Sequence, residues 1–500
     1  MKSMFRVLQI ACLGALLTGT VQAQFLEDAL RIARPTEAAG ARSAAMGNAF
    51  IGVADDFSAI HWNPAGLGLI RESEFAIGLT NFSVDNDATY LGITTPYENS
   101  TTHLSSIGMV LPFPVQRGSF VLAAGYNRLA NYAGALRTDG FNPYSSIQRS
   151  LYDDTDSDYD LAWNLGLEDT ILFTYQDQGI PGWNAITINK NVYQVQDVLE
   201  SGNLGQWSFG GSMEVARDMF VGVTLNVLSG TYRYDRTFLE TDPGNLHSGT
   251  IVGYGNRART DFQSLEINQL VNQDIGGWNA KFGFLYKVQD IARVGVTVQS
   301  PYSVTVTESF DVSGLARFGT GLEEFGLPTS NSEYDISTGW VFGLGASVTP
   351  VSFVRISADV EFPDYSLIEF GDGSDASFNR LNKDLKRELR ATTNYRFGAE
   401  VTVPGTSLQV RGGYSNAVSP YAEDAKASNA TDFDTKTFAA GLGYTLPNNF
   451  QINATLQSSS FSAYRMNYPD PDTNNVPDSA LRIDEATSRM ALIFSVAYRF

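Results

Sequence analysis

The amino-acid sequence predicts an all-β protein, organised as a transmembrane antiparallel β-barrel of about 14 strands. Three observations support this fold: apolar and polar residues alternate along many segments, short and long connections alternate between them, and the chain opens with an export signal. The composition agrees, because 46 Gly, 23 Tyr and 31 Phe among 500 residues suit pleated strands better than helices. A mean hydropathy of −0.13 excludes a bundle of membrane helices, each of which would need about 20 apolar residues in a row.

The last strand shows the alternation most clearly, because every second residue is apolar while the other face is mixed. Segments 354–362 and 450–457 repeat the pattern with polar residues on the second face. Such faces fit either a soluble sandwich or a membrane barrel with apolar residues outside and polar residues inside. The apolar face of the last strand consists of Leu492, Phe494, Val496, Tyr498 and Phe500.

The connections favour the membrane barrel. Short turns alternate strictly with long polar stretches, as in outer-membrane barrels, whose periplasmic turns are short and whose outer loops are long. This rhythm gives about 14 strands between residues 72 and 500, with both termini periplasmic and a less regular connection at 85–101. Interfacial aromatics are expected at Trp207, Phe220, Trp278, Phe282, Trp340, Phe342, Tyr395, Phe397, Phe438 and Tyr444. The short turns are 112–118, 217–218, 289–292, 349–351, 404–406 and 447–449, and the long stretches are 131–204, 235–276, 307–337, 369–389, 417–433 and 464–486.

The first 23 residues have the pattern of a secretory signal peptide. Lys2 and Arg6 form a positive start, an apolar stretch follows over 7–20, and small residues at 21–23 mark a cleavage site before Gln24. The single cysteine, Cys12, lies in this stretch, so the mature chain is expected to contain neither disulfides nor thiolate metal sites.

Charge and motif content argue against enzymes and nucleic-acid binding. A net charge of −20 leaves nothing to neutralise phosphates along a nucleic acid. The three histidines are scattered, and no nucleophile, zinc or phosphate-loop motif is present, so we expect no catalytic residue, no metal site and no cofactor. Acidic runs, such as the one around Asp470, lack the full ligand set of a calcium loop and are interpreted as solvated outer loops.

Residues 24–71 do not alternate and form a different unit. Segment 25–32 predicts a short helix, and a Gly- and Ala-rich run over 40–69 suits close packing in a confined space. Asn63 and Pro64 predict a turn, because the Asn side chain bonds nearby backbone and Pro fixes φ.

This run resembles the FadL/TodX family of outer-membrane transporters for long-chain fatty acids and hydrocarbons. The resemblance implies an N-terminal hatch, or plug, over 24–71, a barrel over 72–500 and passive uptake of long-chain fatty acids or other hydrophobic compounds. PorV-like barrels, which act as scaffolds or shuttles in protein secretion, share a similar run and remain the alternative. The hatch residues that carry the resemblance are Gly40, Arg42, Met46, Gly47, Asp55, Asp56, Asn63, Pro64, Ala65 and Gly66.

The resemblance also implies partners and a route for the ligand. The expected partners are a hydrophobic small molecule, the lipid and lipopolysaccharide of a Gram-negative outer membrane, and the barrel assembly machinery, which would read the strand ending in Phe500. The third strand, 118–130, contains Ala123-Ala124-Gly125 and is a candidate for a lateral exit. Apolar segments in two long connections fit either packing against the barrel mouth or a capture groove for ligand, and the resemblance favours the groove. The candidate ligand-binding residues are Phe50, Phe57, Trp62, Trp163, Phe173, Leu265 and Leu270.

Overall fold

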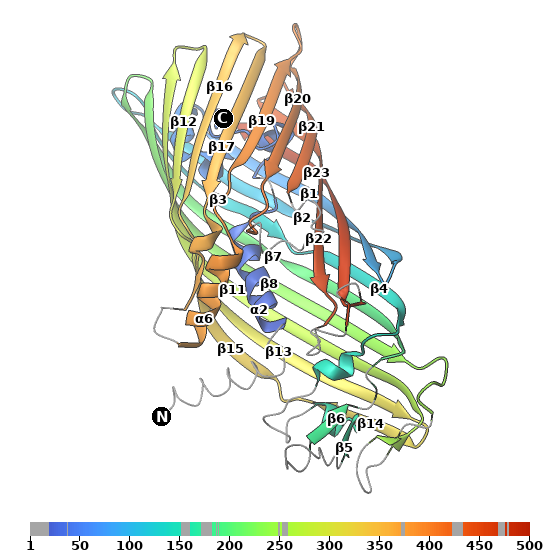
Figure 1. Ribbon diagram of the computed structural model, residues 1–500. Coiled ribbons are helices and arrows are strands. Elements are labelled where there is room, and N and C mark those ends of the chain that lie inside the picture. Colours follow the sequence, from blue (N-terminus) through green and yellow to red (C-terminus); the bar gives the residue numbers. More distant parts are fainter. Residues whose placement is uncertain are drawn as a thin grey trace.

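The computed structural model is a closed, strongly twisted antiparallel barrel with helices inside and beside it (Figure 1). The described residues are 20–37, 39–151, 161–171, 183–186, 188, 190–248, 251–252, 259–371, 376–422, 434–468, 476–477 and 480–500. The helices are α2 (Thr20–Ala33), α3 (Ala41–Ala45), α4 (Ala59–Trp62), α5 (Leu161–Asn164) and α6 (Ala376–Glu388), and the 3-10 turns include η1 (Pro64–Leu69), η2 (Ile147–Ser150) and η4 (Tyr365–Leu367). Among the described residues, no helix is both long and apolar enough to cross a membrane.

The barrel has 14 strand positions, as the sequence predicted, and β1 closes it by pairing with β23 from Glu74↔Arg499 to Tyr90↔Ile483. Four positions are each built from two strands in succession, namely β3 with β4, β12 with β13, β15 with β16, and β17 with β18. The wall strands are β1 (Glu74–Tyr90), β2 (Ile93–Phe113), β3 (Phe120–Asn131), β4 (Gly134–Asn142), β7 (Val192–Ala216), β8 (Met219–Thr241), β11 (Phe262–Val288), β12 (Ala292–Gln299), β13 (Ser303–Phe318), β15 (Ser330–Ser337), β16 (Val341–Val351), β17 (Val354–Pro363), β18 (Glu369–Phe370), β19 (Asn394–Thr402), β20 (Leu408–Ala417), β21 (Thr435–Thr445), β22 (Phe450–Met466) and β23 (Arg482–Arg499).

Several predicted long connections are wrong, because strands run through them. β1 and β2 continue to a tight turn at Leu91 and Gly92, where 85–101 was expected to be irregular. The stretches 131–204, 235–276 and 307–337 also contain ladder-paired strand, including the short β14 (Gly321–Gly326). In several of these parts, such as 192–204 of β7, apolar and polar residues fall on both faces, so the alternation that reveals a half-buried strand is weak. In β13 the alternation of Phe310, Val312, Ala316 and Phe318 is regular, and the sequence analysis overlooked it.

The outer face of the wall is apolar where strand alternation predicted it. Leu492, Phe494 and Val496 of β23 point outward with exposed fractions of 39%, 48% and 36%, while Ile493 is buried. Trp207, Trp278 and Phe438 also lie outside, as an interfacial girdle requires. Phe220 is a correction, because it points inward, 2% exposed, and packs against Ala65 and Leu285.

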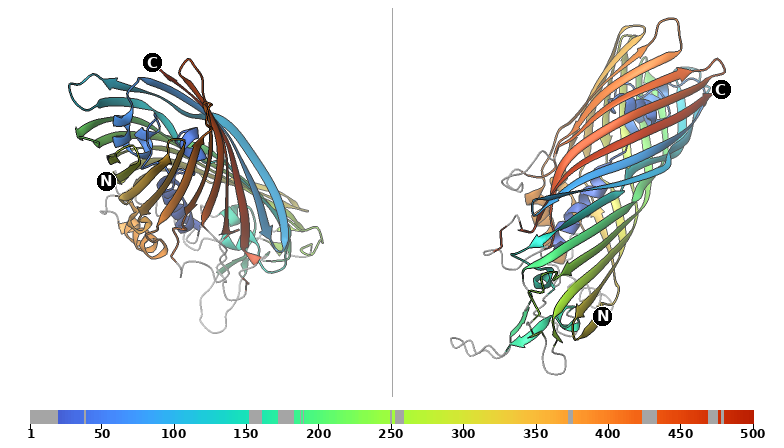
Figure 2. Two further views of the ribbon diagram at one scale, coloured as in Figure 1. Left: turned by 90° about the horizontal axis from the view of Figure 1, so that it is seen from above. Right: turned by 90° about the vertical axis from the view of Figure 1, so that its right-hand side faces the viewer.

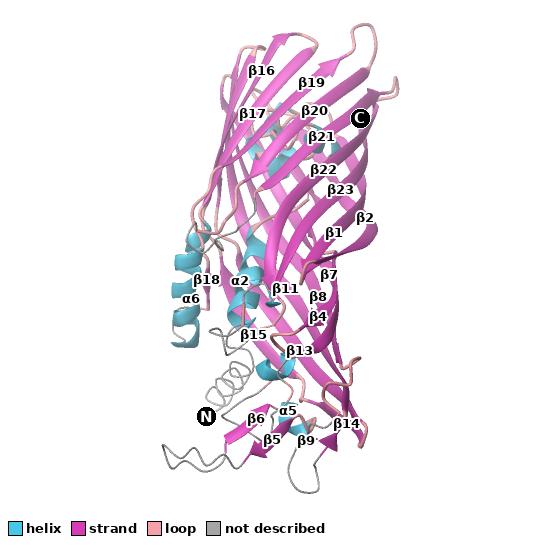
Figure 3. Cartoon of the chain, turned by 45° about the vertical axis from the view of Figure 1, so that its right-hand side comes forward, coloured by secondary structure: helices cyan, strands magenta, loops and turns pink. Residues whose placement is uncertain are grey.

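The barrel is much taller on one side than on the other (Figures 1 and 3). β7, β8 and β11 have 25, 23 and 27 residues, whereas β17, β19 and β20 have 10, 9 and 10. About 9–11 residues suffice for a strand to cross a bilayer, so the tall strands extend well beyond it. We call the end with the short turns the turn end and the opposite end the loop end.

Candidate ligand-binding site

Residues 39–70, here called the luminal segment, fold into the barrel near the turn end (Figure 2). Helix α3 contacts β20, β21, β22 and β23, and η1 contacts β3, β7, β8 and β11, so the segment reaches opposite parts of the wall. Met46, Phe50 and Ile51 are fully buried there. The small residues predicted to allow close packing therefore lie in a confined space.

Asn63 and Pro64 form the predicted turn and fasten it to the wall. The Asn63 Oδ1 atom accepts a hydrogen bond from the Ala65 amide at 3.1 Å and caps η1, in which Pro64 is the first residue. Its Nδ2 atom donates to the Ile51 carbonyl at 2.9 Å and to the Phe284 carbonyl of β11 at 3.2 Å. One side chain thus joins two parts of the luminal segment to the barrel.

An ionic network ties α3 to the wall at the turn end. Arg42 binds both carboxylate oxygens of Glu400 on β19, at 2.8 and 2.9 Å, and donates to Asp55 at 2.6 Å. Arg293 of β12 and Arg355 of β17 reach the other oxygen of Asp55 at 2.9 and 3.1 Å. Bidentate arginine–carboxylate pairs are among the strongest and most directional polar contacts in proteins.

The charge balance in this network keeps Asp55 ionised. Burial alone would raise the pKa of the Asp55 carboxyl, but the guanidinium groups of Arg42, Arg355 and Arg293 outweigh burial and hold it well below its usual range. The pKa of Arg42 is raised well above its usual value, because its attraction to Asp55 and Glu400 exceeds the cost of burial. The network is therefore a permanent set of charges at neutral pH.

Glycines on the inner wall let the backbone of the luminal segment approach closely, a feature that sequence reasoning missed. A Cβ added to Gly413 would come within 2.0 Å of the Gly47 nitrogen, and one added to Gly222 within 2.4 Å of the Pro64 carbonyl carbon. Only glycine fits such contacts between two backbones. Wall glycines that meet the backbone of the luminal segment in this way are Gly222, Gly283, Gly295, Gly345, Gly398 and Gly413, whereas Gly108 and Gly125 make room for the Phe57 ring and Gly441 for the Ala45 side chain.

A cavity of about 480 Å³ lies between the luminal segment, α2 and the wall. This volume falls within the usual range for small-molecule sites. Its lining is mixed: Phe82, Val84 and Ile493 supply apolar surface, while many other lining residues carry hydroxyl, amide or charged groups. The cavity therefore suits an amphipathic ligand better than a purely apolar one.

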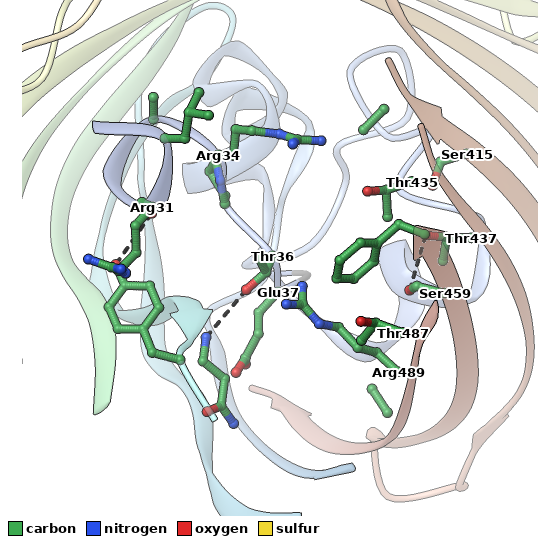
Figure 4. Close-up of a pocket in the computed structure, with 18 of the residues that line it drawn as sticks. Arg31, Arg34, Thr36, Glu37, Ser415, Thr435, Thr437, Ser459, Thr487 and Arg489 are labelled. Atoms are coloured by element: carbon green, nitrogen blue, oxygen red, sulfur yellow. Dashed lines mark hydrogen bonds between the residues drawn. The ribbon is translucent and has the colours of Figure 1, made fainter. Parts of the chain in front are cut away.

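Two arginines reach into this cavity without an acidic partner. Arg34 follows the end of α2, and Arg489 comes from β23 on another side of the space (Figure 4). No described carboxylate forms an ion pair with either of them, and the Arg489 guanidinium lies 4.7 Å from the centroid of the Phe461 ring. Hydroxyl groups of Thr435, Thr437, Ser459 and Thr487 line the space nearby.

Trp62 and His61 form the floor of the cavity. The Trp62 indole donates to the Ala39 carbonyl at 3.0 Å, and the Arg396 guanidinium lies 5.2 Å from its ring centroid. His61 Nδ1 lies 3.1 Å from the Gln206 amide nitrogen. Burial, and then the positive charges of Lys281 and Arg396, hold the pKa of His61 well below its usual range, so the ring is neutral.

Of the candidate ligand-binding residues, Trp62 alone is found among those lining the cavity. Phe50 and Phe57 are 0% and 4% exposed and pack within the luminal segment and against the wall. Leu265 lies in a buried cluster at the loop end, and Leu270 lies on the opposite face of β11. The backbone of Trp163 belongs to α5, but its side chain and the whole of Phe173 lie outside the described residues.

The remaining hatch candidates all lie in the luminal segment. Gly40 precedes α3 with φ 93°, and Gly47 follows it with φ 61°. Asp56 accepts from Arg42 at 3.3 Å and from the Ser58 hydroxyl at 2.6 Å, and a Cβ on Gly66 would meet the Ala54 carbonyl. The sequence analysis did not identify Arg34 and Arg489 as cavity residues, because nothing in the sequence separates them from other arginines.

The loop end is closed by side chains of the wall and its connections. Leu161, Leu165 and Leu167 join a buried apolar cluster with Leu265 and Ile267. Among the described residues, no group of three or more His, Cys, Asp or Glu side chains has the arrangement of a metal site. The acidic runs at 153–160, 372–375 and 470–478 fall almost entirely outside the described residues.

The pairing between β2 and β3 is incomplete. The two strands are paired from Ser106↔Asn127 to Phe113↔Phe120, and the rest of β2 pairs with β1 alone. The Ala123–Gly125 stretch, the predicted weak point, is regularly paired on both sides, so that prediction is wrong. The irregularity lies further on, with a register shift between Arg128 and Ala130 and a break before β4.

The fold and its interior define a class: closed barrels of 14 strands with an N-terminal segment folded into the lumen. The particular fold is that of the FadL/TodX-type barrels, as the sequence resemblance implied. A Pseudomonas aeruginosa FadL homologue is 11% identical over 93% of this chain and 97% of its own, with a TM-score of 0.54. The P. putida toluene transporter TodX is 13% identical over 92% and 98%, with a TM-score of 0.53. No family model and no curated protein matches the sequence.

Proposed function

We propose that this chain is an outer-membrane transport protein for passive uptake of hydrophobic compounds, and that its ligands are long-chain fatty acids. The fold of a FadL homologue and of a toluene transporter supports the general role. The apolar belt on the wall supports a place in the outer membrane, with the turn end and the C-terminus in the periplasm. The N-terminal helix α2 packs in the same cluster as α6, toward the loop end, so a periplasmic N-terminus remains only a prediction from the sequence. The observation that carries the finer proposal is the pair of unpartnered arginines, Arg34 and Arg489, in a cavity of mixed polarity.

The cavity chemistry matches a carboxylate attached to an alkyl chain. Guanidinium groups bind carboxylates through charge-assisted hydrogen bonds, and neighbouring hydroxyls complete the shell of donors. Apolar surface from Phe82, Val84 and Phe461 takes the first part of the chain, with a gain of roughly 25 cal/mol per Å² buried. An aromatic hydrocarbon such as toluene has no group for the two arginines, so they favour an acid.

In this proposal the luminal segment, with α2, is the hatch, and it keeps the barrel from leaking small solutes. The Arg42 network and the wall glycines hold it in place between uptake events. The exit toward the membrane is the seam between the part of β2 before Ser106 and the end of β3 with β4, because no ladder pairing joins the strands there. The signal peptide over 1–23 remains a prediction, and the secretion-shuttle alternative has only the sequence motif in its favour.

Ligand binding to purified protein tests the proposal. The double variant Arg34→Gln/Arg489→Gln should bind oleate about tenfold or more weakly, the scale for losing a hydrogen bond to a charged group, while toluene binding stays unchanged. The matched control is Arg233→Gln, which removes an exposed arginine from the outer face of β8. Equal oleate affinity in the double variant and the parent protein would contradict the fatty-acid proposal, and failure of the parent protein to bind both oleate and toluene would contradict the transport role.

A further inference from the structure

Helix α6 and the groove beside it form a feature on the outside of the barrel that the transport route does not use. The helix stands against the short side of the wall, near the loop-end tips of β17 and β19 (Figures 1 and 3). Leu381 and Leu385 on its buried face, and Leu389 directly after its end, are 7%, 1% and 2% exposed and pack into the cluster that also holds α2. The opposite face of α6 contributes no described residue to this apolar cluster.

That opposite face is cationic in a chain of net charge −20. Arg380, Lys383 and Lys386 are exposed on it, and none of them forms an ion pair among the described residues. The flanking acid Asp384 is already engaged, because Arg387 binds it at 3.0 Å. Three uncompensated cations on one side of a single helix form an anion-attracting surface.

An apolar groove of about 450 Å³ adjoins the C-terminal end of α6. Trp340, Phe342 and Leu367 line it and are about half exposed, at 47%, 51% and 49%. Ala391, two residues after the buried Leu389, lines it as well, so the helix leads directly into the groove. Trp340 and Phe342 belong to the apolar belt of the barrel, which makes the groove continuous with the lipid-facing surface.

The helix is held in a fixed position relative to this groove. The Asn382 side chain donates to the Phe370 carbonyl at 3.0 Å and accepts from the Phe370 amide at 2.8 Å. The rings of Phe370 and Phe378 are stacked with centroids 6.2 Å apart. These contacts fix α6 against β18, and its further contact with η4 (Tyr365–Leu367) places it beside the groove that Leu367 lines.

We propose that this surface binds a phosphorylated, multiply acylated glycolipid of the outer leaflet, of the lipopolysaccharide type. Its phosphates contact Arg380, Lys383 and Lys386, and an acyl chain fills the groove beside Trp340 and Leu367. A cationic face above an apolar groove matches a lipid whose anionic head lies above its chains, and each basic residue near an anionic membrane surface strengthens such binding. The inference rests on the proposed outward orientation of the loop end, and it is independent of the ligand in the luminal cavity.

Native mass spectrometry of the full chain in detergent, with added lipid A, tests this site. The variant Lys383→Glu/Lys386→Glu should bind bisphosphorylated lipid A at least about tenfold more weakly than the parent protein. Lipid A without phosphates should bind weakly to both the parent protein and the Lys383→Glu/Lys386→Glu variant. A second variant, Leu367→Asp, should also weaken binding, because it places a charge in the acyl groove. Both changes are at exposed positions, and unchanged heat-modifiable gel migration would show that the barrel is intact.

The matched control is Arg137→Glu/Arg217→Glu, which makes the same change in net charge at two exposed positions away from α6. It should bind lipid A as the parent protein does. An equal loss of lipid A binding in this control would show that general charge attraction causes the effect, and it would contradict the proposed site. Unchanged lipid A binding in the Lys383→Glu/Lys386→Glu variant would also contradict it. Oleate binding is measured in parallel, so failure of the glycolipid site and failure of the transport proposal are distinguishable.

Discussion

The two ends of the lumen are closed in different ways. At the turn end, the luminal segment is attached to the wall by Arg42, Asp55 and Glu400 and by contacts between backbones at wall glycines. At the loop end, the closure is an apolar cluster built from the wall strands and their own connections. The buried carboxylate Glu240 at this end accepts hydrogen bonds from neutral donors such as Ser146 at 2.6 Å and Gln194 at 2.7 Å.

The different construction of the two ends indicates which of them is able to move without breaking the barrel wall. An apolar cluster contributed by the wall opens only if strands separate, which breaks many ladder hydrogen bonds at once. The luminal segment has no ladder bonds to the wall and is held by side-chain hydrogen bonds and ion pairs from many wall strands, such as those of Glu400, Asp359 and Thr224. We therefore propose that the luminal segment at the turn end is the detachable closure, whereas the apolar cluster at the loop end is part of the barrel.

The largest effect is expected from Arg42→Ala. Removing one partner of a buried ion pair costs about 3 kcal/mol in this network, at the lower end of the usual range, because Arg293 and Arg411 still serve Asp55 and Glu400. Hydrogen exchange should report this as faster opening of residues 39–70, with the wall strands unchanged. The control Arg42→Lys keeps the charge but loses the bidentate contact with Glu400. Its exchange rates for residues 39–70 should therefore lie between those of the parent protein and those of Arg42→Ala. Unchanged protection of 39–70 in Arg42→Ala would show that the network does not hold the segment.

A smaller effect is expected from overpacking the wall. Gly413→Ala would place a methyl group within 2.0 Å of the Gly47 nitrogen, and crowding of this kind costs about 1–3 kcal/mol. The matched control is the neighbouring Gly412→Ala, whose added carbon would have the Ala439 oxygen as its nearest neighbour at 3.9 Å. Thermal unfolding should separate the two variants. If both are equally stable, close backbone packing is not what seats the segment.

Asn63→Ala should loosen the segment by about 1–2 kcal/mol. The change removes the hydrogen bonds to Ile51 and Phe284 and the cap on Ala65, and leaves their buried groups unsatisfied. Asn63→Asp retains the acceptor for Ala65 but loses both donated bonds and places a buried carboxylate against two carbonyl oxygens, so its exchange should be at least as fast as that of Asn63→Ala. If Asn63→Ala opens residues 39–70 as much as Arg42→Ala does, the ionic network is not the stronger of the two attachments.

The smallest effect is expected from mild acid. The folded pKa of Asp55 lies below its unfolded value, so its stabilising contribution is fully present above the unfolded pKa of about 4 and is lost as the pH falls through the folded value. Exchange of residues 39–70, corrected for the intrinsic pH dependence, should be the same at pH 7 and pH 5 and rise only below about pH 4. Clear loosening at pH 5 would show that another group controls the closure.

The sequence predicted the fold well where one side of a strand faces lipid. The β23 alternation and the short turns fixed the number of strands, because apolar and polar surroundings there differ sharply. The prediction failed for the long strands on the tall side, such as β7 and β8. These parts extend past the apolar belt, where apolar and polar residues fall on both faces and weaken the period-two signal.

The site was less predictable than the fold. The Asn63–Pro64 turn follows from local chemistry, and the structure has it. The glycines that receive the segment, such as Gly413 and Gly222, are scattered over many strands, so their common position depends on the register of the whole barrel. The same holds for Arg489, whose lack of an acidic partner among the described residues is a property of the three-dimensional neighbourhood and not of its sequence context.

Single-channel conductance in planar bilayers tests the central claim most directly, namely that the luminal segment is a detachable plug at the turn end. The account predicts that the parent protein is nearly silent and that Arg42→Ala shows frequent opening steps. The loop-end variant Glu240→Gln, which alters a buried carboxylate without touching the luminal segment, should remain as silent as the parent protein. Silence of Arg42→Ala, in a protein whose residues 39–70 exchange freely, would show that the luminal segment does not close the barrel and would contradict the account.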